Sequence, residues 1–182
     1  MAAAPLVLPI NRVTDGKAQW RRGQLDYFWS SIWPEAVQDL GRCGIQVQAT
    51  QTPGEVDRPS QRQPIITGLQ HGALNLAITD QIPMYWDHGR ALNGVTMMYR
   101  GYHLCMVALN WAHRHQLPVV SVNTCLHEIL HALLHDIFET KPQGFAGQSR
   151  EARVDACATR MWLFGDGSAV RGPAREYVAK LK

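Results

Sequence analysis

The segment His127–His131, which reads HEILH, constrains this chain more than any other. An α-helix turns by about 100° and rises by about 1.5 Å per residue, so its two histidines lie one turn apart on one face. That spacing lets both imidazoles bind one metal ion, with the Glu128 carboxylate placed to accept a proton from metal-activated water. The apolar flanks favour a helix, with Asn123 or Thr124 as its N-cap. The alternative is a buried helix whose histidines only form hydrogen bonds.

The length and composition suit one compact domain, so residues 1–182 are predicted to share a single core. No apolar run reaches the ~18–20 residues that a membrane span needs. The segment Met1–Ile10 has no basic residue at its start and contains Pro5 and Pro9, so it does not resemble a signal peptide. We therefore expect a protein of the cytoplasm, or one packaged within a larger particle, that does not bind membranes.

Cysteine usage and net charge narrow the range of partners further. The 4 cysteines are scattered without a C-x-x-C pair, which favours buried thiols over disulfides or cysteine metal ligands. A net charge of +3 is too small to indicate nucleic-acid binding. The sequence does not indicate an oligomeric state.

Hydrophobic periodicity predicts an α+β domain with a twisted mixed sheet. The N-terminal helix and the HExxH helix are expected to pack on this sheet, followed by a C-terminal helix that carries the third metal ligand. A long loop is expected over Thr50–Pro64, polar segments over Asp80–Gly94 and Trp111–Pro118, and a hairpin turn at Arg100-Gly101. The expected strands are Leu6–Ile10, Ile45–Ala49, Leu74–Thr79, Val95–Tyr99 and Tyr102–Leu109, and the N-terminal helix is expected over Gln24–Leu40.

A catalytic zinc site needs a third protein ligand and an open position for water. His135 lies about 12 Å from His127 along the helix axis, so we expect it to support the site or the helix rather than bind the ion. Among the later acids, Glu151 and Asp155 share one face of a helix predicted between Ser149 and Gly165. Glu151 would complete the site, and Asp155 would accept a hydrogen bond from a ligand histidine. The alternative is that both acids are ordinary surface residues paired with neighbouring arginines.

HExxH followed about twenty residues later by E-x-x-x-D resembles the gluzincin branch of the zincin metallopeptidases, as in thermolysin. The local sequence is also similar to the ImmA/IrrE-type peptidases. The resemblance covers about forty residues, from Cys125 to Phe164, and implies that Glu151 binds zinc and Asp155 orients a ligand histidine. It also implies a zincin-like domain in which an extended peptide adds to the edge strand Val95–Tyr99. The chain departs from the metzincin pattern, which needs Gly and His where Leu134 and Ile137 stand, and it is short after Gly165.

These features predict a peptidase with one Zn²⁺ ion and a protein or peptide substrate. His127, His131 and Glu151 would hold the ion, and Glu128 would take a proton from water and pass it to the leaving amine. The alternatives are a catalytically silent metal-binding domain in a larger assembly and a hydrolase of a non-peptide amide. The reaction also needs a donor for the developing oxyanion. Its candidates are His103, His113, His115, Tyr99 and Tyr177.

Overall fold

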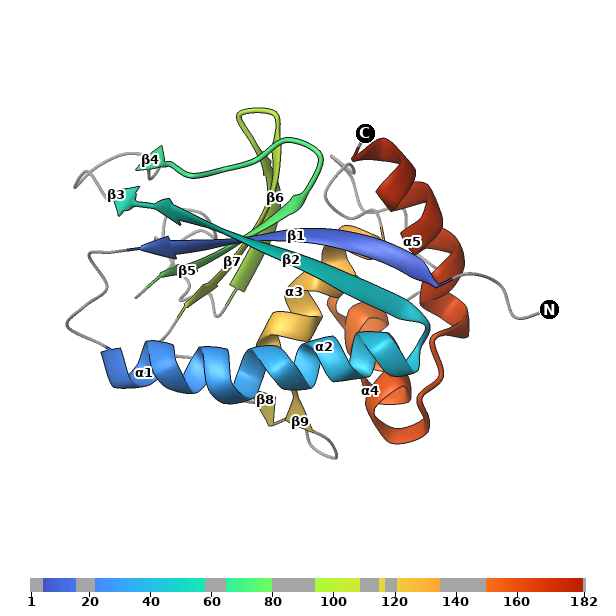
Figure 1. The fold of residues 1–182 in the computed structure, drawn as a ribbon. Helices are drawn as coiled ribbons and strands as arrows, with labels where there is room; N and C mark the ends of the chain where they lie inside the picture. The colour runs from blue at the N-terminus through green and yellow to red at the C-terminus, as the bar shows by residue number, and fades with distance from the viewer. Residues whose placement is uncertain are drawn as a thin grey trace.

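The computed structural model describes residues 5–15, 22–57, 65–79, 94–108, 115–116, 121–134 and 150–181. Within them the chain folds into a mixed sheet with helices on one side, which confirms the α+β class. Figure 1 shows the sheet crossing the molecule, with the N-terminal helical segment along one side. Helix α3 (Thr124–Leu133) lies near the middle, and α4 (Arg150–Phe164) and α5 (Ser168–Lys180) lie in the half of the molecule that contains the C-terminus. No described helix has the length and apolar content needed to cross a membrane.

The main sheet has the strand order β2-β1-β5-β7-β6. Strands β2, β1, β5 and β7 run parallel to one another, whereas β6 pairs antiparallel with β7 and forms one edge. The bounds are β1 Leu6–Asp15, β2 Ile45–Gly54, β5 Leu74–Thr79, β6 Gly94–Tyr99 and β7 Tyr102–Ala108. A tight turn joins β6 to β7 through Arg100 (φ 49°) and Gly101 (φ 84°). Positive φ at both central residues is the geometry of a two-residue hairpin turn, so the predicted hairpin is confirmed.

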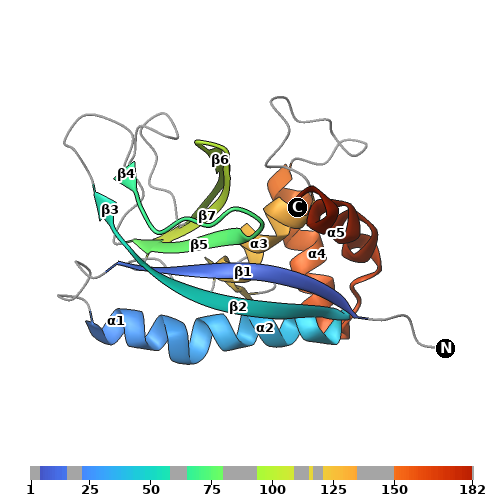
Figure 2. The same cartoon turned by 45° about the horizontal axis from the view of Figure 1, so that its top comes forward.

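The N-terminal helix is longer than predicted and contains a π-helical turn. It runs through α1 (Arg22–Tyr27), η2 (Phe28–Ile32) and α2 (Trp33–Arg42). Pro34 lies in the first turn of α2, directly after η2. A proline cannot supply the N–H of an i→i−4 bond, and a π-turn lets the helix continue past it. In Figure 2 this helix lies along one side of β1 and β2.

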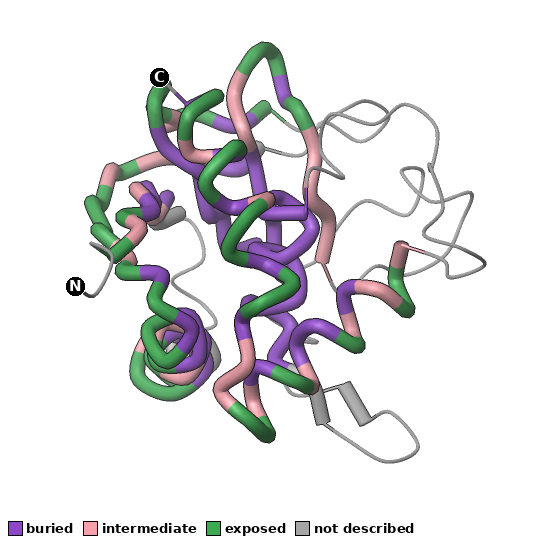
Figure 3. The backbone as a smooth tube through the Cα atoms, turned by 90° about the vertical axis from the view of Figure 1, so that its right-hand side faces the viewer, coloured by how far each residue is buried: buried purple, intermediate pink, exposed green. Residues whose placement is uncertain are grey.

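The two faces of the sheet have different covers. Alternate residues of β1, β5 and β7, among them Ile10, Leu76 and Val107, join the large core formed with the helices. Residues of opposite parity, such as Leu104 and Met106, form a smaller cluster on the other face with β3 (Val56–Asp57) and β4 (Ile65–Ile66). Figure 3 shows the buried stretches gathered centrally, with exposed stretches on the outer sides of the helices.

One prediction about the chain outside the site was wrong. The loop expected from Thr50 does not begin there, because β2 stays paired with β1 as far as Gly54. The tail after Gly165 forms a further helix, α5 (Ser168–Lys180), which contacts β1 and the HExxH helix. Of the expected polar segment Asp80–Gly94, residues 80–93 lie outside the described residues, and Gly94 is the first residue of β6. The described part of the Trp111–Pro118 segment is strand β8 (His115–Gln116), which pairs with β9 (Ser121–Val122).

Candidate metal centre

The HExxH segment forms the buried helix α3 (Thr124–Leu133), as predicted. Asn123 is its N-cap: its side-chain oxygen accepts a hydrogen bond from the Leu126 N–H at 3.1 Å. The Asn123 amide also donates to the Ile32 carbonyl at 2.9 Å, which ties the start of α3 to the N-terminal helix. All ten residues of α3 are buried. The histidines therefore occupy fixed positions within the core rather than on a mobile surface.

Three ligand atoms from two helices converge at one point. The Nε2 atoms of His127 and His131 are 2.9 Å apart. From α4 (Arg150–Phe164), the Glu151 carboxylate reaches 3.0 Å from the first of these atoms and 3.4 Å from the second. Two ligands bound at ~2.0–2.1 Å to a tetrahedral zinc ion lie about 3.3 Å apart, so the spacing fits one such ion. These three residues form the group whose donor atoms could hold a metal among the described residues.

Asp155 fixes which nitrogen of His127 faces this point. Its Oδ1 atom is 3.0 Å from His127 Nδ1, so that nitrogen carries the proton and donates to the carboxylate. The Nε2 lone pair of a neutral imidazole is then available to a cation. The predicted contact between Asp155 and a histidine ring is confirmed, and Glu151 contacts both imidazoles as the metal prediction requires.

The electrostatics of the cluster favour a positive charge between its members. Burial disfavours a charged His127, but the hydrogen bonds to Asp155 and Glu151 raise its pKa to about 10. The hydrogen bond to His127, and after it the one to His131, hold the pKa of Glu151 well below its usual range. In the absence of a metal, these imidazole and carboxylate groups therefore hold a proton between them, and a metal ion could bind to the same atoms in its place. Two imidazoles and a carboxylate are a donor set that suits zinc.

The Glu128 side chain lies on the same helix and contacts the edge strand. Glu128 is only 5% exposed, and its Oε2 atom accepts a hydrogen bond from Thr96 Oγ1 at 2.7 Å. A Cβ added at Gly94 would overlap the Glu128 carboxylate, so any larger residue would have to displace that carboxylate from its position. Burial raises the pKa of Glu128, and the nearby imidazoles oppose that rise. The edge strand therefore holds the carboxylate in place beside the imidazoles.

Thr96 and Gly94 are site residues that sequence reasoning missed. Strand alternation places them on the same side of β6, and their contacts with Glu128 show that this side faces α3. The sequence carries the alternation but does not show which side of the strand meets the helix.

The remaining predicted residues have mixed outcomes. Tyr99 belongs to the cluster on the sheet face away from the helices, and its hydroxyl accepts from the Ile66 N–H at 3.3 Å, so it does not face α3. His103 Nδ1 and the hydroxyl of the fully buried Tyr177 lie 3.0 Å apart. His135 and His113, and the side chain of His115, lie outside what the structure describes. All four cysteines are buried and form no disulfide, as expected.

The fold and the cluster together define an α+β protein with a candidate His₂Glu metal centre. The chain matches no family model, and no curated protein or solved structure gives a match either. The assignment of chemistry therefore depends on the residues and their geometry.

Proposed function

We propose that this protein is a zinc-dependent metallopeptidase that hydrolyses peptide bonds of a protein substrate. The observation that carries the proposal is the convergence of His127, His131 and Glu151 from two helices distant in sequence. The Glu128 carboxylate beside them is the group that a hydrolytic site needs and a purely structural site does not. An HExxH helix packed beside a sheet whose edge strand is antiparallel also suits a zincin-like domain.

Each residue of the site has a distinct role in this proposal. Zinc held by the two Nε2 atoms and the Glu151 carboxylate would polarise the scissile carbonyl and acidify a water molecule. Asp155 keeps the Nδ1 proton of His127 and so keeps Nε2 unprotonated. A carboxylate oxygen of Glu128 takes the proton from water and later gives it to the leaving amine. The Glu151 side chain is 68% exposed, which leaves the cluster open to water and substrate.

A second candidate function is a metal-binding domain without catalysis. The contacts that favour it join α3 to α4: Glu151 and Asp155 both come from α4, and both meet His127 of α3. A metal at this position would clasp the two helices together and so stabilise the fold. In that case Glu128 would have only a packing role, and the protein would act as a component of a larger assembly.

Two substitutions separate these functions. Glu128→Gln should retain zinc, measured by metal analysis of the purified protein, and should lose cleavage of a peptide library followed by mass spectrometry. Glu151→Ala should lose most of the zinc as well as the cleavage. Asp26→Asn, at an exposed position of α1, is the matched control and should change neither. Normal cleavage by Glu128→Gln would rule out the peptidase proposal, whereas zinc binding without cleavage in the unsubstituted protein would support the structural role.

A further inference from the structure

Strand β2 forms the edge of the main sheet opposite to β6, and its outer side pairs with no described strand. It runs for 10 residues, Ile45–Gly54, in unbroken register with β1. Figure 2 shows β2 at the side of the sheet away from β5, β7 and β6. The outer side of such a strand presents a row of unpaired N–H and C=O groups to which a strand of another chain can bind.

The bonds between β1 and β2 determine which backbone groups point outward. The Leu6 N–H donates to the Gly44 carbonyl at 3.2 Å, and Leu6 lies opposite Ile45 in the parallel register. Because every second residue of a strand bonds to a given neighbour, the even-numbered residues of β2 bond to β1. The outward N–H and C=O groups are therefore those of Ile45, Val47, Ala49 and Gln51.

The neighbouring helix does not cover the middle of this edge. Side chains at odd-numbered positions of β2 lie on the helix side of the sheet, where Ile45 and Val47 join the large core. Ile45 is buried and Val47 is half-buried, but Ala49 is exposed although it lies on the same side. The exposed side chains on the other side of the strand are Gln46, Gln48 and Thr50. A further strand could therefore approach in the plane of the sheet.

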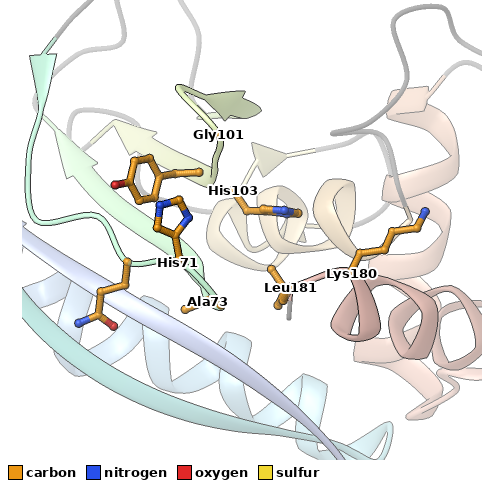
Figure 4. A pocket seen from close by; sticks show the side chains of 9 residues that line it. His71, Ala73, Gly101, His103, Lys180 and Leu181 are labelled. Carbon is orange, nitrogen blue, oxygen red and sulfur yellow. The ribbon is translucent and has the colours of Figure 1, made fainter.

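Side-chain hydrogen bonds hold the second half of β2 in place. Thr52 Oγ1 donates to Asn11 Oδ1 at 2.8 Å, and Gln70 Nε2 donates to Thr52 Oγ1 at 2.8 Å. Gln70 also lines a cavity of about 330 Å³ beside the end of α5 (Figure 4). No residue lining that cavity belongs to β2, so the cavity and the edge are separate surfaces. The edge is thus preformed by the fold.

We propose that the β2 edge binds the β2 edge of a second copy of this chain, and that the two strands pair antiparallel about a two-fold axis. Such pairing is self-complementary, because each outward residue then lies opposite an outward residue of the other copy. The outward N–H groups of the two copies together donate about eight backbone hydrogen bonds, a number typical of a specific interface. The two sheets become one continuous sheet.

The composition of the strand favours a second copy as the partner. No charged residue lies between Ile45 and Gly54, although the chain carries a net charge of +3. Two copies therefore meet at this edge without like charges directly opposite one another, which would destabilise the pair. Natural edge strands are often protected from pairing by lysine or proline. β2 has no lysine, and its one proline, Pro53, lies beyond the four outward residues.

Dimerisation at β2 leaves the candidate metal centre open. Strands β2 and β6 form opposite edges of the sheet, and the contact of Glu128 with the sheet is made through Thr96 of β6. The proposal therefore does not rest on the proposed peptidase activity, and zinc content should be the same in monomer and dimer.

The test measures the mass of the full-length, zinc-loaded protein by analytical ultracentrifugation at several concentrations. We expect a reversible change from 20.4 kDa to twice that mass, with a dissociation constant of about 1–100 µM. A protein that remains monomeric up to about 500 µM, well above this range, would overturn the proposal.

Hydrogen exchange followed by NMR locates the interface in the unsubstituted protein. The amides of Val47, Ala49 and Gln51 should gain protection as the dimer forms, because their N–H groups become bonded. The amide of Gln48 already bonds to β1 and should change much less. A dimer that forms without this alternating protection has its interface elsewhere, and the proposal is then wrong.

Charge substitutions at Ala49, near the middle of the edge, test the pairing itself. Ala49→Lys and Ala49→Glu each bring like charges together across the axis and should weaken dimerisation about tenfold or more. An equimolar mixture of the two variants should dimerise again, because opposite charges then meet. Ala179→Lys adds the same charge at an exposed position of α5 and should change the dissociation constant by less than about twofold.

The far-UV circular dichroism of each variant should match that of the unsubstituted protein, since Ala49 and Ala179 are both exposed. Equal weakening by Ala179→Lys and Ala49→Lys would show that net charge, and not the β2 edge, controls association. A mixture of the two Ala49 variants that stays monomeric would rule out the antiparallel pairing of β2 with its own copy.

Discussion

At the scale of single residues, the hydrogen bond from His127 Nδ1 to Asp155 controls which imidazole nitrogen faces the cluster. Asp155→Asn keeps the size of the side chain but removes the negative charge that favours this tautomer. We expect zinc affinity to fall by about 10- to 100-fold, the usual effect of losing such a partner of a ligand histidine. Competition with a chromophoric chelator measures it, with Asp26→Asn as the control. Unchanged affinity would show that Asp155 does not orient His127.

The contact between Thr96 and Glu128 gives a second prediction. Thr96→Val has nearly the same shape but cannot donate to the buried Glu128 carboxylate, which the hydroxyl approaches at 2.7 Å. Loss of the donor should lower the free energy of unfolding by about 1–3 kcal/mol in urea denaturation. Thr96→Ser keeps the hydroxyl and should lose much less.

A double-mutant cycle shows whether that loss comes through the carboxylate. In a Glu128→Gln background the charged acceptor is gone, so Thr96→Val should cost less than it does in the unsubstituted protein. Equal costs in the two backgrounds would mean that Thr96 acts through its bond to the Glu128 main-chain carbonyl or through packing, and not through the carboxylate.

The residues of the His127–His131–Glu151 cluster were predictable at this scale, and the residues around Glu128 were not. Helical periodicity places His127 with His131, and Glu151 with Asp155, because residues four apart share a face in any helix. No such regular spacing in the sequence relates Thr96 to Glu128. Their contact depends on how β6 is placed against α3, which is a long-range packing outcome.

At the scale of elements, the start of α3 depends on Asn123. Asn123→Ala removes the cap on the Leu126 N–H and the bonds that the amide donates to the Ile32 carbonyl and the Glu35 carboxylate. We expect a loss of about 1–2 kcal/mol or more in the free energy of unfolding. Asn123→Ser keeps a capping oxygen and should lose less. If the two variants are equally stable, the cap contributes little and the side chain acts through its amide.

Strand β2, which was mispredicted, and helix α5, for which no structure was predicted, show where local pattern is overridden. The second half of β2 is a polar run of Thr and Gln with no apolar face, yet it stays in register with β1 because the ladder bonds its backbone. In α5, Gly172 and Pro173 argue against a helix. The buried side chains of Val170 and Tyr177 override them by packing into the main core. By contrast, β5 and the hairpin were predictable from apolar runs and one turn.

At the scale of the whole molecule, the order β2-β1-β5-β7-β6 could not be predicted from the sequence. Strand β1 pairs in parallel with both β2 and β5, so it joins segments that are far apart along the chain. Such pairings are decided by which faces pack together, and only the class of the fold follows from the pattern of elements. The same packing brings α4 against α3 and completes the cluster.

Because the cluster joins two helices, metal removal should change how the stability of the whole protein depends on pH. In the metal-free protein, burial opposes a charged His127, but its bonds to Asp155 and Glu151 raise its pKa to about 10, above the ~6.5 of an unfolded chain. A raised pKa means that the protonated form contributes stability fully below about pH 6.5. That contribution is lost as the pH rises through about 10.

Zinc should reverse this dependence, because metal and proton compete for the same imidazoles and binding strengthens as the pH rises. We expect the difference in Tm between zinc-loaded and EDTA-treated protein to widen between about pH 6 and pH 9. Thermal unfolding monitored by circular dichroism at several pH values measures it. In Glu151→Ala, which lacks the carboxylate ligand, the two curves should nearly coincide. A difference that shrinks with rising pH in the unsubstituted protein would mean that the histidines do not bind the metal, because a site built from imidazoles gains affinity as they lose their protons.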